Sequence, residues 1–279
     1  MIEVIQWLPS PKKLALTVAI LTVLLLNCCN STRVTVHPGW GKYFKEAGVR
    51  GCFMLHDYTL HQFAVYNQPR MEQRFLPAAT FNTLNTLIGL ETGIIRDTNM
   101  VIRWNGIVKS NPDWPMDPTL AQAFRNSITP YFQEVARRIG RDTLQQYLDS
   151  IKFGNMVIGS QTDSFWLDNS LKISPDELLG FLEKLYFSKL PFTDLTQRMV
   201  RGVMQMENSP LYELYYNTGN GIVGSKKIEW VDGWEEENGH PFFFVLNTES
   251  SNTGINLKKT SLEILMAILM KAGLMRGRM

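Results

Sequence analysis

Apolar residues recur with different spacings along the chain, and the spacing predicts where strands give way to helices. Short apolar runs at residues 51–57 and 62–66 flank a polar segment, which predicts a β-hairpin. From about residue 77 to 206 the apolar positions recur every three or four residues, which is typical of amphipathic helices. Within this region Ser174, with Glu177 three residues later, predicts the start of one such helix.

The pattern returns to strands in the last part of the chain. Residues 211–216, 226–234 and 241–247 predict three strands, and Asn-Gly pairs at 220–221 and 238–239 predict turns. One apolar stripe predicts a final amphipathic helix: Leu262, Leu265, Met266 and Leu269. Because strands and helices are segregated along the chain, we predict an α+β fold. It consists of an antiparallel sheet flanked by helices, with the long helical region inserted as a subdomain.

The N-terminus has the composition of a targeting signal. Lys12 and Lys13 precede an uncharged apolar run at residues 14–26, which is typical of a secretory signal peptide. We therefore predict a signal peptide at residues 1–29, followed by a single exported domain at residues 30–279. The run is short for a membrane span of about 20 residues. The expected location is the periplasm, or a membrane to which the protein is anchored by a lipid.

Cysteine usage and charge limit the chemistry further. Cys28 or Cys29 directly follows the apolar run and is a candidate lipidation site; the alternative is an ordinary signal peptide with incidental cysteines. Cys52 is predicted to be a buried structural thiol, since one remaining cysteine cannot form an intramolecular disulfide. The 28 basic and 26 acidic residues give a net charge of +2, which gives no reason to expect a nucleic-acid partner. We expect no metal and no cofactor.

Residues 77–82 (PAATFN) resemble a catalytic helix start that has lost its reactive groups. In Ser-x-x-Lys hydrolases the nucleophile and its base lie there, since a spacing of three places both on one helix face. Here the two positions hold Ala79 and Asn82. A methyl group cannot attack a carbonyl, and an amide cannot accept a proton near neutral pH. Thr80 carries a hydroxyl, but one helical step rotates it by about 100°.

Longer stretches around this segment resemble the class D (oxacillinase-type) serine β-lactamases and the related β-lactam sensor domains. These proteins share the penicillin-binding transpeptidase-like fold, which the resemblance implies here. The stretches that carry the resemblance are 51–53 (GCF), 74–78 (RFLPA), 87–93 (LIGLETG), 123–125 (AFR), 133–140 (QEVARRIG), 165–167 (FWL), 173–175 (ISP) and 233–234 (GW).

The resemblance also implies where the catalytic groups should be, and each of these positions is changed. The family's serine nucleophile falls on Ala79, and the carboxylated lysine that acts as its general base falls on Asn82. The tyrosine of the Tyr-Gly-Asn motif falls on Phe153, and the lysine of the Lys-Thr-Gly motif falls on Asn217. No catalytic residue of the family is therefore intact at these four positions.

Candidate binding residues remain. By resemblance they are Ser127, Trp104, Trp166, Thr218, Gly219 and Lys258, where Lys258 replaces an arginine that binds the substrate carboxylate. The Ser-x-Val motif that begins at Ser127 now has Thr129 at its third position. We hypothesise that Asn82 forms a hydrogen bond with Thr129 or Trp166, so that the former base pocket leaves no polar group unpaired.

We therefore predict an exported class D β-lactamase-like protein that is catalytically inactive. At most it is a module that binds or senses a β-lactam or a peptidoglycan stem without a covalent bond. One alternative is an active β-lactamase that hydrolyses penicillins through a serine acyl-enzyme. Another is an engineered sequence in which the key residues of an active parent were replaced. The oligomeric state and the natural ligand stay open.

Overall fold

The structure, a computed structural model, describes residues 33–103 and 116–276. The fold below is that of these described residues, which belong almost entirely to the unit Val34–Met279. The predicted signal segment with Cys28 and Cys29 lies outside the described residues, as does Trp104. Within the described residues, no helix is both long enough and apolar enough to cross a membrane.

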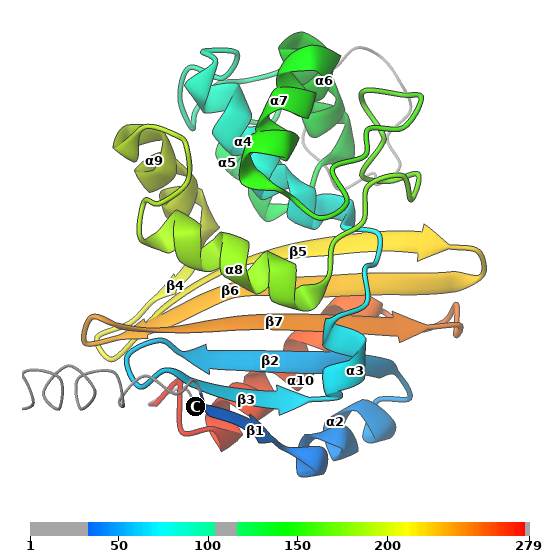
Figure 1. Cartoon of the computed structure of the whole chain (residues 1–279), viewed down its shortest axis with the longest axis vertical. Helices are drawn as coiled ribbons and strands as arrows, with labels where there is room; N and C mark the ends of the chain where they lie inside the picture. Colours follow the sequence, from blue (N-terminus) through cyan, green and yellow to red (C-terminus); the bar gives the residue numbers. More distant parts are fainter. Residues whose placement is uncertain (1–32, 104–115, 277–279) are drawn as a thin grey trace, which may run out of the picture. The chain divides into compact units, whose positions relative to one another are not determined.

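A twisted sheet forms the centre of the domain (Figure 1). Its strands follow the order β1-β3-β2-β7-β6-β5-β4. Antiparallel pairs join β2 to β3 and to β7, β6 to β7 and to β5, and β5 to β4. The predicted antiparallel arrangement is confirmed in these five pairs, whereas β1 runs in the same direction as β3 and makes the sheet mixed (Figure 1). The strands are β1 (Arg33–Val36), β2 (Arg50–Asp57), β3 (Gln62–Tyr66), β4 (Gln205–Asn208), β5 (Glu213–Val223), β6 (Lys226–Glu237) and β7 (His240–Ser250).

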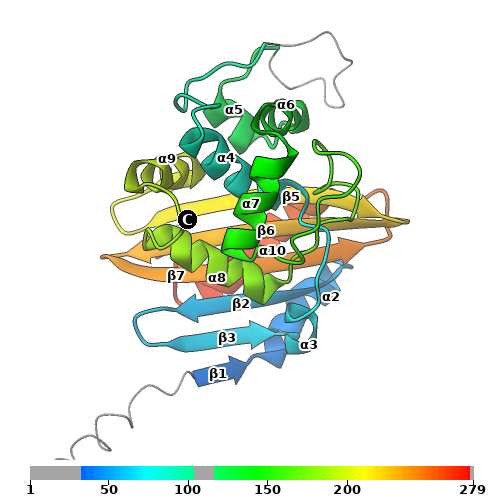
Figure 2. The same cartoon turned by 45° about the horizontal axis from the view of Figure 1, so that its top comes forward.

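Helices cover both faces of the sheet (Figures 1 and 2). Helix α8 lies along one face with α4, α5, α6, α7 and α9 beyond it, and α10 covers the opposite face. The predicted helical insertion is confirmed by the helices between β3 and β4. The helices are η1 (Pro38–Trp40), α2 (Gly41–Glu46), α3 (Gln68–Met71), η2 (Ala78–Thr80), α4 (Phe81–Glu91), α5 (Leu120–Arg125), α6 (Thr129–Ile139), α7 (Arg141–Ile151), α8 (Pro175–Tyr186), α9 (Asp194–Met204) and α10 (Leu257–Lys271).

The sheet separates two hydrophobic cores because side chains alternate between its faces. On β7, Phe243 and Val245 belong to the core under the helical insertion, whereas Phe244 and Leu246 belong to the core under α10. At the start of α8 the backbone N–H of Ser174 donates to Glu177 at 3.0 Å, which confirms the predicted helix start.

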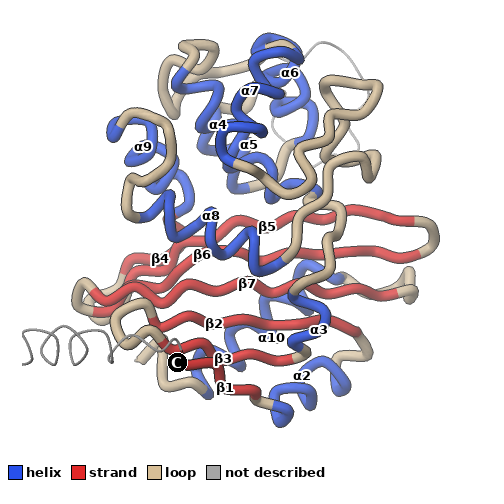
Figure 3. The backbone as a smooth tube through the Cα atoms, viewed as in Figure 1, coloured by secondary structure: helices blue, strands red, loops and turns tan. Residues whose placement is uncertain are grey.

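One predicted turn is wrong. The Asn220-Gly221 pair lies inside β5, and the hairpin between β5 and β6 turns at residues 224–225 instead (Figure 3). The glycine has a packing role, because a Cβ on Gly221 would lie 2.5 Å from Cδ2 of Leu76. The second Asn-Gly pair does form its turn, with positive φ at Asn238 and Gly239. The strands β1 and β4 were not predicted.

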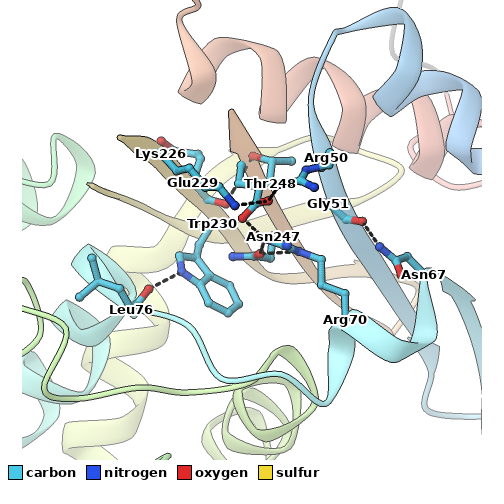
Figure 4. A network of polar contacts seen from close by, with 11 residues as sticks. Arg50, Gly51, Asn67, Arg70, Leu76, Lys226, Glu229, Trp230, Asn247 and Thr248 are labelled. Atoms are coloured by element: carbon cyan, nitrogen blue, oxygen red, sulfur yellow. Dashed lines mark hydrogen bonds and ion pairs between the residues drawn. The ribbon is translucent and has the colours of Figure 1, made fainter. Parts of the chain in front are cut away.

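A buried ionic network holds the segment that leads into η2 (Figure 4). Arg70, in α3, donates to Oδ1 of Asn247 at 2.7 and 3.1 Å and pairs with Glu249 at 3.3 Å. Its guanidinium also lies 4.2 Å from the ring centre of Phe75. Further along, the indole N–H of Trp230 donates to the carbonyl of Leu76 at 2.8 Å. The chain therefore reaches η2 already fixed to β6 and β7.

We expect the substitution Arg70→Ala to lower the free energy of unfolding by about 3 kcal/mol, because it leaves Glu249 buried with one partner fewer. Arg50→Ala is the matched control: Arg50 pairs with the same carboxylate at 2.6 Å, but its side chain is 73% exposed. Its loss should cost less than about 1 kcal/mol. Urea denaturation of the three proteins measures both values, and equal losses would contradict the network's importance.

Candidate functional site

At the position that the resemblance assigns to the nucleophile, the structure holds a methyl group against the sheet. Ala79 lies in η2 and is only 7% exposed. Gly219 of β5 faces it so closely that a Cβ there would lie 2.6 Å from the amide nitrogen of Thr80 and 3.0 Å from that of Ala79. The hydroxyl of Thr80 donates to the carbonyl of Pro77 at 2.9 Å. It is committed to the helix start and cannot replace the missing nucleophile.

Asn217 joins β5 to η2 through its side-chain amide. Its Nδ2 group donates to the carbonyl of Ala79 at 2.8 Å and to Oγ1 of Thr83 at 3.3 Å. Its Oδ1 accepts from the backbone N–H of Thr218 at 2.8 Å. Both hydrogens and the oxygen of the amide are therefore used. Where the resemblance implies a lysine, the chain has a neutral cross-link.

Ser127 joins this group of residues through a hydrogen bond to β5. Its Oγ donates to the carbonyl of Thr218 at 3.0 Å, and its own backbone has a positive φ of 50°. The structure thus brings together five predicted positions: Ala79, Ser127, Asn217, Thr218 and Gly219. Each is buried, and the side chains of Ser127 and Asn217 are hydrogen-bonded.

The hypothesis about Asn82 is wrong. The residue is 2% exposed, but within the described part of the chain its Nδ2 has no hydrogen-bond partner. Trp166 instead stacks on Phe81, with ring centres 5.1 Å apart. A buried donor without a partner costs about 1–3 kcal/mol. Asn82 therefore fills the position that the resemblance assigns to the general base, but its Nδ2 group has no hydrogen-bond partner in the described chain.

Phe153, at the family tyrosine position, belongs to an aromatic cluster. Its ring lies 6.1 Å from Phe81 and 5.2 Å from Phe181, both edge to face. The phenyl ring is 2% exposed and needs no hydrogen-bond partner. The next residue, Gly154, has a φ of +57°, and a Cβ there would lie 2.0 Å from the carbonyl of Lys172. The loop is thus kept in shape although the hydroxyl is lost.

Lys258 lies apart from this group. It is in the first turn of α10, on the opposite face of the sheet, and lines a cavity of about 260 Å³ with Asn220, Gly221 and Glu229. In the described part of the chain, no hydrogen bond or ion pair joins it to the other predicted site residues. Burial raises the pKa of Glu229 to about 8, and nearby Lys258 opposes the rise.

Two acidic residues of β6 were missed from the sequence. Glu229 and Asp232 are both buried, and neither oxygen of Asp232 has a hydrogen-bond partner among residues 33–103 and 116–276. Burial raises the pKa of Asp232 well above its ordinary value. The available signal was an acid within the apolar strand that contains Trp230 and Trp234. Among the same residues, no group of three or more His, Cys, Asp or Glu side chains is arranged to hold a metal ion.

Comparisons with known proteins identify the family. Residues 49–269 match the family described as the penicillin binding protein transpeptidase domain. β-Lactamase OXA-10 of Pseudomonas aeruginosa is 33% identical over 236 residues, covering 82% of this chain and 89% of the relative. The probable β-lactamase YbxI of Bacillus subtilis (strain 168) is 36% identical over 246 residues, covering 84% of this chain and 92% of the relative. The chain belongs to the class D β-lactamase family.

Solved structures of this family have the same fold. The class D β-lactamase YbXI from Nostoc superimposes with a TM-score of 0.82 at 32% identity, covering 86% of this chain and 100% of the relative. The C-terminal domain of the Bacillus licheniformis BlaR penicillin-receptor gives a TM-score of 0.83 at 30% identity, covering 88% of this chain and 98% of the relative. The fold of a class D β-lactamase, predicted from the resemblance, is confirmed.

The contact between β5 and η2 should tolerate no side chain at Gly219. We expect Gly219→Ala to lower the free energy of unfolding by about 2 kcal/mol, because its Cβ would collide with backbone atoms. The control Gly180→Ala, in α8, has no atom within 4 Å of the new Cβ. It should stabilise the domain by up to about 1 kcal/mol. Thermal unfolding measures both signs, and a stabilising effect at Gly219 would contradict the close contact.

The raised pKa of Glu229 predicts that the free energy of unfolding falls as the pH rises. The unfolded chain releases this proton near the ordinary value of 4.5, whereas the folded chain retains it up to about pH 8. The contribution is therefore complete below 4.5 and is lost as pH rises through 8. In melting experiments across this range, Glu229→Gln should flatten the decline. Glu263→Gln, at a side chain 66% exposed, is the control. Parallel declines in all three proteins would exclude Glu229 as a source.

Proposed function

We propose that this class D β-lactamase homologue does not form an acyl-enzyme. The observation that carries the proposal is the pair Ala79 and Asn82, neither of which can attack or activate an attack. The neighbouring Ser127 hydroxyl donates to Thr218, and no described lysine lies close enough to form a hydrogen bond with it. No replacement nucleophile is therefore activated in this group of residues.

The proposed function is non-covalent ligand binding at the edge of β5. Strand β4 pairs with β5 only over Glu213–Tyr215, so in the described residues no strand pairs with the outer edge of β5 beyond that point. An extended peptide or a β-lactam amide can add to such an edge through backbone hydrogen bonds. One solved relative is a penicillin-receptor domain, which supports a recognition role for this fold.

The proposal includes export. Residues 1–29 have the composition of a signal peptide, and Cys28 or Cys29 is the candidate lipidation site. The proposed ligand is a penicillin or a peptidoglycan stem peptide encountered outside the cytoplasm. With Asn217 in place of a lysine, the carboxylate of such a ligand meets no cation at that position, so binding should be weak.

Intact-mass measurement with a labelled penicillin tests the absence of acylation. We expect no mass increase and no turnover of a chromogenic cephalosporin, because the chain lacks a nucleophile at position 79. OXA-10 serves as the positive control under the same conditions. A covalent adduct on the unsubstituted chain would refute the proposal and favour an active β-lactamase.

Calorimetric titration tests the binding role separately. We expect a penicillin or an acyl-D-Ala-D-Ala peptide to bind reversibly without any change in protein mass. The control variant Gly219→Val places a bulky side chain against η2 and should abolish the signal. If neither ligand produces heat at high concentration, the binding role is excluded, while the absence of acylation stands.

A further inference from the structure

Asp232 lies directly beside the position at which the family resemblance places a lysine. In the antiparallel pairing of β5 and β6, Asp232 is the cross-strand partner of Asn217. Directly opposite residues share one face of a sheet, with Cβ atoms about 5 Å apart. Both side chains therefore point to the face covered by the helical insertion. The carboxyl is completely buried, and neither oxygen has a partner in the described chain.

Among the described residues around Asp232, none donates a hydrogen bond to its carboxyl group. The amide of Asn217 is already committed to Ala79, Thr83 and Thr218. The partner on β7 is Val245, and the next residues of β6 on the same face are Trp230 and Trp234. An acid in such a place is costly, and it would gain most from a cation supplied by the neighbouring position 217.

We propose that Asp232 is a specificity-determining residue. It would pair with a cation placed at position 217 and keep that cation from the cleft. A lysine introduced there would form a buried ion pair with Asp232, and its ammonium would be held beneath β5. The inference rests on the proposed loss of acylation and extends it. The cleft then has a determinant outside the four motif positions, on the neighbouring strand β6.

Restoring the catalytic residues with and without Asp232 tests this. The starting variant combines Ala79→Ser, Asn82→Lys, Phe153→Tyr and Asn217→Lys, and its acylation rate by a fluorescent penicillin is measured. We expect Asp232→Asn or Asp232→Val to raise that rate at least tenfold, roughly the effect of freeing one charge-assisted contact. Glu235→Gln is the matched control, since Glu235 is a buried acid of the same strand. It lies on the face of the sheet opposite to Asp232, where it accepts a hydrogen bond from the backbone N–H of Met275.

The two substitutions at Asp232 separate charge from packing. Capture of the cation requires a negative charge, so the isosteric Asn should restore the rate as well as Val does. Rescue by Val alone would assign Asp232 a packing role and overturn the proposal. Equal rates with and without Asp232 would also overturn it, as would an equal gain from Glu235→Gln.

A double-mutant cycle in the otherwise unsubstituted chain covers the case in which the restored variant does not fold or react. Asn217→Lys and Asp232→Asn are made singly and together, and the melting temperatures are compared with that of the unsubstituted chain. Without its acid the buried lysine has no partner, so the pair should melt at least about 5 °C below the sum of the single effects. Additive effects overturn the inference. An acyl adduct on the unsubstituted chain, in contrast, would refute only the proposed function.

Discussion

The cleft depends on the close approach of β5 to η2. This contact requires a glycine at position 219, because any Cβ would enter the backbone of the short helix. It also fixes where the carbonyl of Ala79 lies, and so allows Asn217 to bind it. The ionic network around Arg70 and the indole of Trp230 hold the segment that delivers η2 to this place. These contacts therefore hold the backbone around Ala79 in place.

The neutral side chains at the positions that the resemblance assigns to catalytic groups differ in how well they are accommodated. The amide nitrogen and oxygen of Asn217 are both hydrogen-bonded. Phe153 packs in an aromatic cluster and needs no hydrogen-bond partner. Asn82 is different, because its buried Nδ2 has no partner in the described chain. A satisfied network stiffens a site, whereas an unsatisfied donor costs stability. The former base position is therefore the less well adapted half of the cleft.

Sequence patterns predicted the main strands and helices because their apolar faces pack against extensive cores. They failed where a local signal had another cause. Asn220-Gly221 looked like a turn, yet its glycine serves the contact with Leu76. The short strand β4 has a mostly polar sequence and is specified by pairing with β5.

The site was predictable in its positions but not in its hydrogen bonds. The family motifs indicated Ala79, Ser127 and Asn217, and the structure brings them together. No pattern could show that Nδ2 of Asn82 lacks a partner, since the hydrogen bonds of a buried side chain depend on how distant segments pack around it. Asp232 was missed because the Lys-Thr-Gly motif lies on β5, whereas the acid lies on the neighbouring strand β6.

The acids of β6 connect these changes into one electrostatic picture. Asp232 lies beside Asn217 on one face of the sheet, and Glu229 lies near Lys258 on the other. Both therefore stand next to positions where the family resemblance places a cation that binds substrate. An acid at such a place would compete with the substrate for the cation. The neutral side chain at position 217 and the buried acids of β6 are thus parts of one electrostatic arrangement.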